Sequence, residues 1–479
     1  MRITPEQFFG EYVPERIIGT ECEYRMFRLY KPEQGMIPDI HECSVGYEEV
    51  YNKFVEDMGL KVCSAPRGIA LQNGGNIHND VNHAEYATPE ALGPRAAAAA
   101  DFAGSVIIRK LAALFGDNTY AFRRAATAQP TRKGRQEAIR TTGYHENYLF
   151  PSSLIGDKLM MAILPTYLVT RVWSGKGLVC QDGFHLFQKA SGVASNSLND
   201  MTGITTEGRK PMYILKSNNI NSDSNINQNY DWARLEVRFA DPGESPAARF
   251  MALGTASLVL RMLEHPKITA AALTRLSINN ALPAKTLIDR DLSFATTYST
   301  GPDRKRYNVL DIGEGLAELA LQLADIIQLP RDEQEAAVQW RHLIDDLRAC
   351  DPKNYDYRPV ADVVDFVPKL HDLIRHYGID GVNADNDYAI NRDMGWDSVW
   401  PAGNGSRYWQ RVGGRQQLIP PGLVEHLVEF PPDGTRGVIR GQSIRQETAT
   451  HASWIRVVHK DGSEQHLPEG YLCNLDIAA

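Results

Sequence analysis

Thirteen residues between His78 and Glu90, HNDVNHAEYATPE, carry a high density of side chains that can bind a cation or move a proton. The segment holds two histidines and three carboxylates, those of Asp80, Glu85 and Glu90. Carboxylates that lie close together in a folded protein repel one another unless a proton or a cation separates them. These side chains are therefore either solvated separately or gathered around a positive charge.

Two further segments place charged side chains at alternating positions, which is the periodicity of a β-strand. ERIIGTECEYRMFRL puts Glu21 and Glu23 on one face of a predicted strand. WARLEVRFAD predicts a second strand, in which Glu236 lies between Arg234 and Arg238 on the same face. Each of these strands is expected to present one charged face.

Convergence of the charged faces would create a site for a hard divalent cation. Asn76, His78 and Asp80 share a face of another predicted strand, and GYHENY adds His145 and Glu146. Mg²⁺ takes oxygen ligands and keeps open positions for phosphate, so it would relieve the repulsion between converging carboxylates. The alternative is that these are exposed faces of strands that lie apart. The sequence alone leaves both interpretations open.

Predicted helices account for much of the chain around these strands. The segment 93–117 has Pro94 in its first turn and Gly116 at its end, the pattern of a helix that begins and stops sharply. Other helices are predicted at 46–59, where Gly59 is the expected C-cap, at 158–173, which contains a proline, at 247–266, and within 313–349 and 361–377. The Asn- and Ser-rich segment 217–231 is predicted to be a mobile loop.

Several catalytic motifs are disfavoured by their spacing. VLDIGEGLAELA at 309–320 is similar to a methyltransferase glycine loop, but it runs directly into helical spacing without the required βαβ context. WSGKG at 173–177 lacks the spacing of a P-loop, and His145-Glu146 lacks the second histidine of HExxH. We therefore expect a helix at 309–320.

The chain is expected to form a large catalytic domain, 1–403, and a small β-rich C-terminal domain, 404–479. Short strands and turns, such as PPDG at 431–434 and KDG at 460–462, set the second part apart. With 479 residues, 43% hydrophobic and 23% charged, the sequence is long and apolar enough for a substantial core.

Charge and cysteine usage narrow the function classes. A formal net charge of −8 argues against nonspecific binding to nucleic acid or to an anionic membrane. Neither a signal peptide nor a transmembrane helix is expected from the sequence. The six cysteines form no CxxC pair, so a disulfide framework is not expected and a reducing cytoplasm is the predicted location.

Taken in order, these segments resemble the family of Pup ligases and Pup deamidases (depupylases), which attach or remove a small ubiquitin-like modifier protein through a glutamate side chain. RIIGTECEYRM is similar to the first strand of that family. NGGNIHNDVNHAEYATPE and GYHENYL resemble its two acidic blocks, and PPDGTRGVIRGQSIRQ and HASWIRVV resemble its C-terminal part. The resemblance covers nearly the whole chain.

The resemblance implies an α+β, glutamine-synthetase-like fold: a curved, mostly antiparallel sheet that forms a cradle backed by helices. It also implies ATP at one end of the cradle and Mg²⁺ along its acidic floor. In such enzymes a glutamate carboxylate attacks the γ-phosphate of ATP, and an amine then attacks the γ-glutamyl phosphate to form an amide.

Roles for individual residues are also implied by the resemblance. Metal or phosphate-region ligands would be Glu21, Glu23, Glu85, His145 and Glu236. Asp80 would be the general base. The remaining assignments concern the nucleotide: Arg234 or Arg238 would contact phosphate, and Arg440 and Trp454 would border the adenine nucleotide.

The sequence departs from the family pattern at several positions. Asn76 and His78 stand where the family has an arginine and a tyrosine, and Glu236 replaces a common histidine. The segment 217–231 replaces a family loop, which affects recognition of the modifier protein. The short segment between the first two acidic blocks lacks the long extra loop of the deamidase branch, so the chain is nearer the ligase branch in this respect.

Three functions are compatible with these patterns. The first is an ATP- and Mg²⁺-dependent carboxylate–amine ligase acting on the modifier protein or on another glutamate-bearing substrate. The second is a hydrolase on the same scaffold, either a deamidase or depupylase or a phosphatase acting on nucleotide phosphates. The third is a noncatalytic nucleotide-binding relative, against which the retained acidic blocks argue.

Overall fold

The computed structural model describes residues 13–28, 53, 57–80, 83–116, 119–129, 138–190, 193–195, 210–216, 232–400, 402–412 and 414–467. Most of the helix predicted at 46–59 and the whole loop predicted at 217–231 lie outside these residues.

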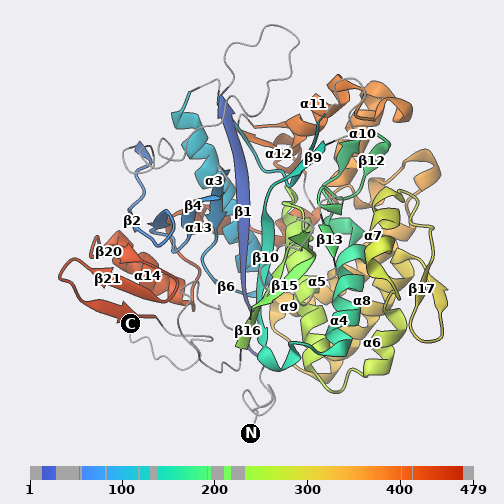
Figure 1. Ribbon diagram of the computed structural model, residues 1–479, viewed down its shortest axis with the longest axis horizontal. Helices are drawn as coiled ribbons and strands as arrows, with labels where there is room; N and C mark the ends of the chain where they lie inside the picture. Colours follow the sequence, from blue (N-terminus) through green and yellow to red (C-terminus); the bar gives the residue numbers. More distant parts are fainter. Residues whose placement is uncertain are drawn as a thin grey trace.

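One large sheet forms the centre of the described structure (Figure 1). Its main path is β15 (Tyr213–Lys216), β16 (Trp232–Val237), β10 (Tyr144–Pro151), β1 (Ile17–Arg28), β5 (His83–Ala87), β4 (Asn76–Asp80), β3 (Ile69–Leu71), β2 (Val62–Ser64), β20 (Ala449–Ala452), β21 (Arg456–His459) and β22 (Glu464–His466). Strands β6 (Ala91–Leu92), β7 (Thr119–Phe122) and β19 (Ser398–Trp400) join it off this path. Neighbours on the main path are antiparallel except for the parallel pair β2–β20.

Four two-stranded sheets flank the main one. They are β8 (Ala126–Gln129) with β9 (Ala138–Thr141), β11 (Leu178–Cys180) with β12 (Gly183–His185), β13 (Val193–Ser195) with β14 (Lys210–Pro211), and β17 (Tyr298–Thr300) with β18 (Lys305–Tyr307).

The described helices lie mainly behind and beside the sheet (Figure 1). They are α3 (Gly93–Leu114), α4 (Lys158–Thr170), α5 (Pro246–Glu264), α6 (Ala270–Leu276), α7 (Ala281–Arg290), α8 (Val309–Ile326), α9 (Arg331–Arg348), α10 (Phe366–Tyr377), α11 (Asp387–Trp396), α12 (Asn404–Trp409), α13 (Pro421–Glu429) and α14 (Arg436–Arg445). This arrangement confirms the predicted α+β fold with a mostly antiparallel sheet backed by helices.

Several local predictions are confirmed. Helix α3 begins at Gly93, just before Pro94, and its chain leaves through Gly116, whose positive φ of 97° favours glycine. The segment predicted as a helix at 309–320 lies in α8, where Asn308 and Asp311 form a capping box. A glycine loop for a cofactor is therefore excluded there.

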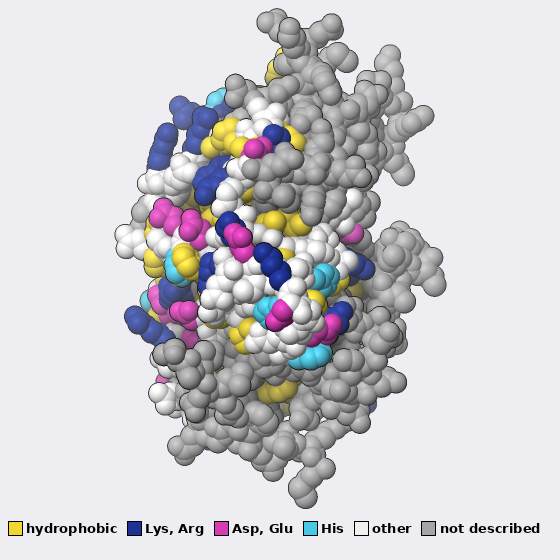
Figure 2. Space-filling view, turned by 90° about the vertical axis from the view of Figure 1, so that its left-hand side faces the viewer, with side chains coloured by type: hydrophobic (Ala, Val, Ile, Leu, Met, Phe, Trp, Pro, Cys, Tyr) yellow, Lys and Arg dark blue, Asp and Glu magenta, His cyan; other side chains and the backbone are white. Residues whose placement is uncertain are grey.

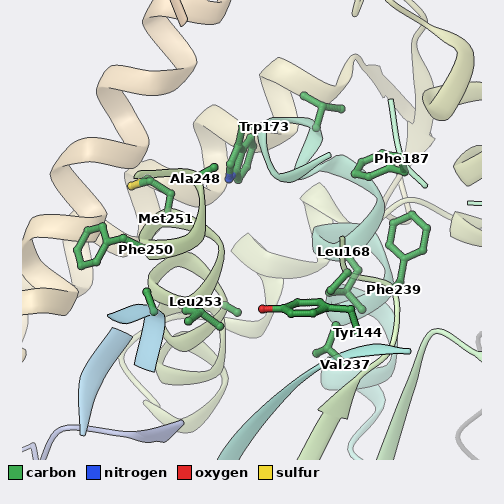
Figure 3. Close-up of a cluster of buried hydrophobic side chains, with 14 of the residues drawn as sticks. Tyr144, Leu168, Trp173, Phe187, Val237, Phe239, Ala248, Phe250, Met251 and Leu253 are labelled. Atoms are coloured by element: carbon green, nitrogen blue, oxygen red, sulfur yellow. The ribbon is translucent and has the colours of Figure 1, made fainter. Parts of the chain in front are cut away.

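The core lies between the sheet and helices α4 and α5. Figure 3 shows Tyr144 of β10 and Val237 of β16 on the same side as Leu168 of α4 and Leu253 of α5. All four side chains are buried. Because side chains alternate along a strand, filling one face of β10 and β16 with core leaves the other face for the polar residues between them.

A closed ionic network lies within this core. Arg249 of α5 approaches both Asp101 of α3, at 3.4 Å, and Glu146 of β10, at 3.2 Å. Arg171 donates a further bond of 2.8 Å to Glu146, and Arg123 pairs with Asp101. These five side chains are at most 2% exposed, so their charges are compensated within the protein and not by water.

The region assigned to a C-terminal domain from residue 404 contains both helices and strands. Leu418 and Leu427 belong to the main core. A second, smaller apolar cluster joins Ile444 and Val457 to Cys63 of β2. The face that carries β20 and β21 bears charged side chains of both signs (Figure 2). The boundary at 403–404 stays a prediction.

Among the described residues, none of the helices combines the length and the apolar character needed to cross a bilayer.

Candidate functional site

A cavity of about 540 Å³ opens on the polar face of the central sheet. It is lined from β1, β4, β5, β10 and β16, from the turn between β2 and β3, and from α14 and the residues after β20. All ten residues predicted for the site except Glu23 line it directly: Glu21, Asp80, Glu85, His145, Arg234, Glu236, Arg238, Arg440 and Trp454. The alternative of separate exposed faces is therefore wrong.

Strand register brings the acidic residues together. On β1, Glu21 lies opposite His145 of β10, and Glu23 lies opposite Glu85 of β5. His78 of β4 lies on the other side of Glu85. Side chains that are directly opposite in antiparallel strands have their Cβ atoms about 5 Å apart, so neighbouring strands deliver their polar groups to one place.

One group able to hold a cation consists of Glu21, Glu85 and His145, whose ligand atoms all lie within 4.8 Å of one another. His145 Nδ1 is 3.2 Å from Glu21 Oε2. Burial raises the pKa of Glu21, but the hydrogen bond from His145 and the charge of Arg234 outweigh it and lower that pKa to about 2. Glu21 is therefore a carboxylate at neutral pH, as a metal ligand must be.

A second group shares Glu85 and adds Glu23 and Asp80, again within 4.8 Å. Burial and the nearby Glu21 charge raise the pKa of Glu85, although His78 Nε2, 3.0 Å away, opposes the rise. Burial is the larger cause of this rise, and the repulsion from Glu21 is the part that a positive charge could compensate. A divalent cation would supply the compensation, and these residues fit one.

Glu236 lies in the cavity but belongs to neither ligand group. Its carboxylate accepts from Arg238 Nε at 2.7 Å and from Arg234 Nη2 at 3.3 Å. Arg234 also approaches Glu21 to 3.5 Å. In this structure Glu236 therefore orients two guanidinium groups at the edge of the acidic floor.

The opposite end of the cavity is built by α14 and the turn at Asn73-Gly74-Gly75. Arg440 is 2% exposed, donates to the carbonyl of Gly74 at 2.9 Å, and stacks on the Trp454 ring with its Cζ atom 4.4 Å from the centroid. A Cβ on Gly74 would lie 2.9 Å from the carbonyl of Gly437, so glycine permits this close approach. Arg440 and Trp454 thus form a stacked wall at this end of the cavity.

Glu90 holds Arg440 of this wall in place through hydrogen bonds. Its carboxylate accepts from Arg436 Nε at 2.6 Å and from Arg440 Nη2 at 2.8 Å. Burial raises the pKa of Glu90, but the two arginines outweigh it and lower that pKa to about 2. Helix α14 is therefore attached to the central sheet by a charged contact inside the cavity.

Three residues at the site were not assigned a role from sequence. His83 Nδ1 is 3.0 Å from Glu23 Oε2, and His78 contacts Glu85 as described above. Arg436 contacts Glu90 together with Arg440. A signal was available for two of them: His83 precedes Glu85 by two positions on one strand, and Arg436 precedes Arg440 by one helical turn.

The solved structures that this chain resembles have the same fold. It is similar to the crystal structure of the complex between the prokaryotic ubiquitin-like protein Pup and its ligase PafA, with a TM-score of 0.72 and 19% identity over 95% of this chain and 89% of that one. A structure of PafA in complex with ADP gives a TM-score of 0.67 and 19% identity over 92% of each chain. The protein therefore has the scaffold of these ligases.

The sequence comparisons identify the family. The profile described as Pup-ligase protein matches residues 16–458, and the chain belongs to this family. It is 26% identical over 411 residues to a Pup–protein ligase of Bifidobacterium adolescentis, covering 81% of this chain and 79% of that protein. It is also 26% identical over 414 residues to a Pup deamidase/depupylase of Mycobacterium tuberculosis, covering 82% and 75%. Identity does not separate the two branches.

Proposed function

We propose that this protein is an ATP- and Mg²⁺-dependent carboxylate–amine ligase that forms an amide or isopeptide bond through a γ-glutamyl phosphate. The observation that carries this proposal is the layout of one cavity. Two carboxylate-rich groups lie at one end, and Arg440 lies against Trp454 at the other. A nucleotide with its base beside Trp454 would direct its phosphates along the cavity toward the carboxylates.

The acidic floor is proposed to hold Mg²⁺. Glu21, Glu85 and His145 form the first ligand group, and Glu23 joins Glu85 in the second. Bound Mg²⁺ would neutralise phosphate charge and align the transferred group. Glu236 is proposed to act in the phosphate region, where its contacts to the guanidinium groups support a positioning role.

The arginines are proposed to bind the nucleotide. Arg234 and Arg238 line the cavity beside the first ligand group and would contact the phosphates. Arg440 and Trp454 would border the adenine nucleotide. The stacking of the two side chains supports this assignment because it presents a preformed planar surface.

Asp80 is proposed as the general base. In the first half-reaction a glutamate carboxylate attacks the γ-phosphorus of ATP, and ADP leaves. In the second, an amine attacks the acyl carbon, phosphate leaves, and Asp80 takes the proton from the attacking nitrogen. Asp80 lies within 4.8 Å of possible ligand atoms of Glu23 and Glu85, so it is close to the proposed phosphate position.

A hydrolase on the same scaffold is the second candidate. The equal identity to the deamidase/depupylase of M. tuberculosis favours it. Water would then take the place of the amine, with Asp80 as the base. The short segment between the first two acidic blocks supports the ligase, because the deamidase branch resembled by this sequence carries a long extra loop there.

The proposed substrate is a small modifier protein or another glutamate-bearing molecule. PafA has been solved in complex with Pup, which supports a protein substrate for its relatives. The segment 217–231, where this sequence departs from the family, lies outside the described residues.

Product analysis distinguishes the two candidates. The protein is incubated with ATP, Mg²⁺, a glutamate-ending modifier and acceptor proteins, and ADP, phosphate and adduct mass are followed. An adduct lighter than the summed reactants by one water, formed with ADP, supports the ligase. Release of modifier from a preformed conjugate, without new adduct, supports the hydrolase, and failure to bind ATP would exclude both.

Asp80→Asn tests the assigned base. Turnover is expected to fall at least a hundredfold, within the usual range for loss of a general base. ATP binding is expected to change less than threefold. Asp461→Asn, in an exposed turn outside the cavity, is the matched control and should retain turnover. Unchanged turnover of Asp80→Asn would remove this residue from the mechanism.

A further inference from the structure

One cationic side chain in the cavity has no role in the function proposed above. Arg67 lies in the turn between β2 and β3, is exposed, and lines the cavity. The turn is closed by a hydrogen bond of 3.2 Å from the amide of Ala65 to the carbonyl of Gly68. The base of the Arg67 side chain is therefore held in place while its guanidinium group reaches solvent.

The other cavity-lining arginines are already paired. Arg234 and Arg238 contact Glu236, and Arg436 and Arg440 contact Glu90. Within the described part of the chain, Arg67 is the one cavity-lining arginine that forms neither an ion pair nor a hydrogen bond through its side chain. Its full positive charge is available to a ligand.

Arg67 and Trp454 follow neighbouring strands and line the same cavity. Strands β2 and β20 run parallel, with Ser64 opposite His451. Arg67 and Trp454 each follow three residues later, so both chains leave the sheet at the same end. Arg67 thus shares this end of the cavity lining with the wall proposed to border the base.

Strand order also places Arg67 next to the acidic floor. Strand β3 pairs with β4 in antiparallel register, with Ile69 opposite Ile77. The residues that precede Ile69 therefore lie toward His78 and Asp80. Across the sheet, the turn that carries Arg67 lies between β20 and β4, and so between the base end and the metal end.

We propose that Arg67 binds the polyphosphate chain of the nucleotide, which would extend from the Trp454 wall to the acidic floor. This inference rests on the proposed function. An arginine suits the position because its planar guanidinium group can donate two hydrogen bonds to one phosphate group. Arg67 thereby sets a preference for nucleoside di- and triphosphates over shorter ligands.

The test compares nucleotide affinity in wild type, Arg67→Ala and Arg67→Lys by calorimetry, with Mg²⁺ and the full chain. Arg67→Ala is expected to weaken ATP binding about tenfold, the usual scale for a hydrogen bond to a charged group. Binding of adenosine should stay unchanged, and Arg67→Lys should recover part of the loss at low salt. Arg456→Ala, which removes a positive charge outside the cavity, should bind ATP like wild type.

Three results would overturn the inference alone. The first is equal ATP affinity of wild type and Arg67→Ala. The second is the same loss for adenosine as for ATP, which would make Arg67 a base contact. The third is an equal loss in Arg456→Ala, because the effect would then reflect net charge. Wild-type protein that binds no ATP would instead defeat the proposed function on which the inference rests.

Discussion

Strand β10 carries Glu146 on one face of the sheet and His145 on the other, and the carboxylates on the two faces are compensated differently. On the core face, Glu146 is surrounded by two arginines and by the hydroxyl of Tyr148, which donates to it at 3.0 Å. On the cavity face, His145 is the partner of Glu21, and Glu85 lies near both. On the core face arginines compensate Glu146, whereas Glu23 and Glu85 on the cavity face have histidines as their charged partners.

This difference distinguishes charged groups that stabilise the fold from charged groups that can bind a ligand. A buried carboxylate with complete partners fixes helices to strands but offers nothing to a ligand. A carboxylate group that lacks cations stores repulsion that a ligand can relieve, and such perturbed groups are typical of functional sites. Two residues adjacent in the sequence can therefore differ in role: Glu146 stabilises the core, whereas His145 faces the cavity.

The largest expected loss of stability comes from a substitution on the core face. Arg249→Met leaves Asp101 and Glu146 buried with fewer partners, and we expect the free energy of unfolding to fall by about 3–5 kcal/mol. Urea unfolding followed by circular dichroism measures it. Arg348→Met is the matched control, since Arg348 forms exposed pairs with Asp311 and Glu314 worth under about 1 kcal/mol. Similar losses in both variants would contradict the distinction drawn here.

Glu90 is an intermediate case, because it is saturated by two arginines although it faces the cavity. Its pKa is lowered from the ordinary 4.5 to about 2, so its contribution to stability is present above pH 4.5 and is lost as the pH falls toward 2. Glu90→Gln should remove roughly 2–3 kcal/mol at neutral pH. It should also flatten the acid-side slope of the unfolding free energy.

The control for Glu90 is Glu447→Gln. Glu447 forms an exposed ion pair with Lys61 and should leave the stability at neutral pH unchanged. If Glu90→Gln has the same pH profile as wild type between pH 5 and 2, then Glu90 does not attach α14 to the sheet.

The smallest stability effect, and of opposite sign, is expected at Glu85. Its pKa is raised by burial and by Glu21, so the folded state binds a proton more readily than the unfolded one, and stability falls as the pH rises above 4.5. Glu85→Gln should therefore raise the free energy of unfolding without metal by up to about 1 kcal/mol. Mg²⁺-dependent ATP binding should nevertheless weaken at least tenfold.

Thermal unfolding and Mg²⁺ titration of nucleotide binding measure the two effects of Glu85→Gln. Glu335→Gln, on the helical side of the protein, serves as the control for metal dependence. A marked loss of stability without metal, or an unchanged Mg²⁺ requirement, would show that the cavity face is structural.

Much of the site could be predicted from the sequence because alternation alone determines which residues share a strand face. Glu21 and Glu23 on β1, and the Arg234–Glu236–Arg238 series on β16, follow from the period of two. The helical spacing of 309–320 likewise argued against a glycine loop, and the structure places this segment in α8. These features depend on neighbours within a few residues.

What could not be predicted depends on register between distant strands. The sequence does not show that His83 meets Glu23, because that contact requires β5 to pair with β1 at one specific offset. It also does not show that β20 joins β2, since a parallel pair between the two ends of the chain has no local signal. These pairings bring the side chains of the site together. Before the structure, only the resemblance to a family supported the prediction that they converge.

The parallel pair β2–β20 has a consequence for the biogenesis of the protein. Ser64 and His451, which lie 3.3 Å apart between Oγ and Nδ1, are separated by 387 positions along the chain. Ribosomes release the N-terminal strands long before the residues that complete the wall beside them. The acidic floor therefore spends most of synthesis without the Arg440–Trp454 wall. If that wall borders the nucleotide as proposed, ATP binding should appear only after the last segment has left the exit tunnel.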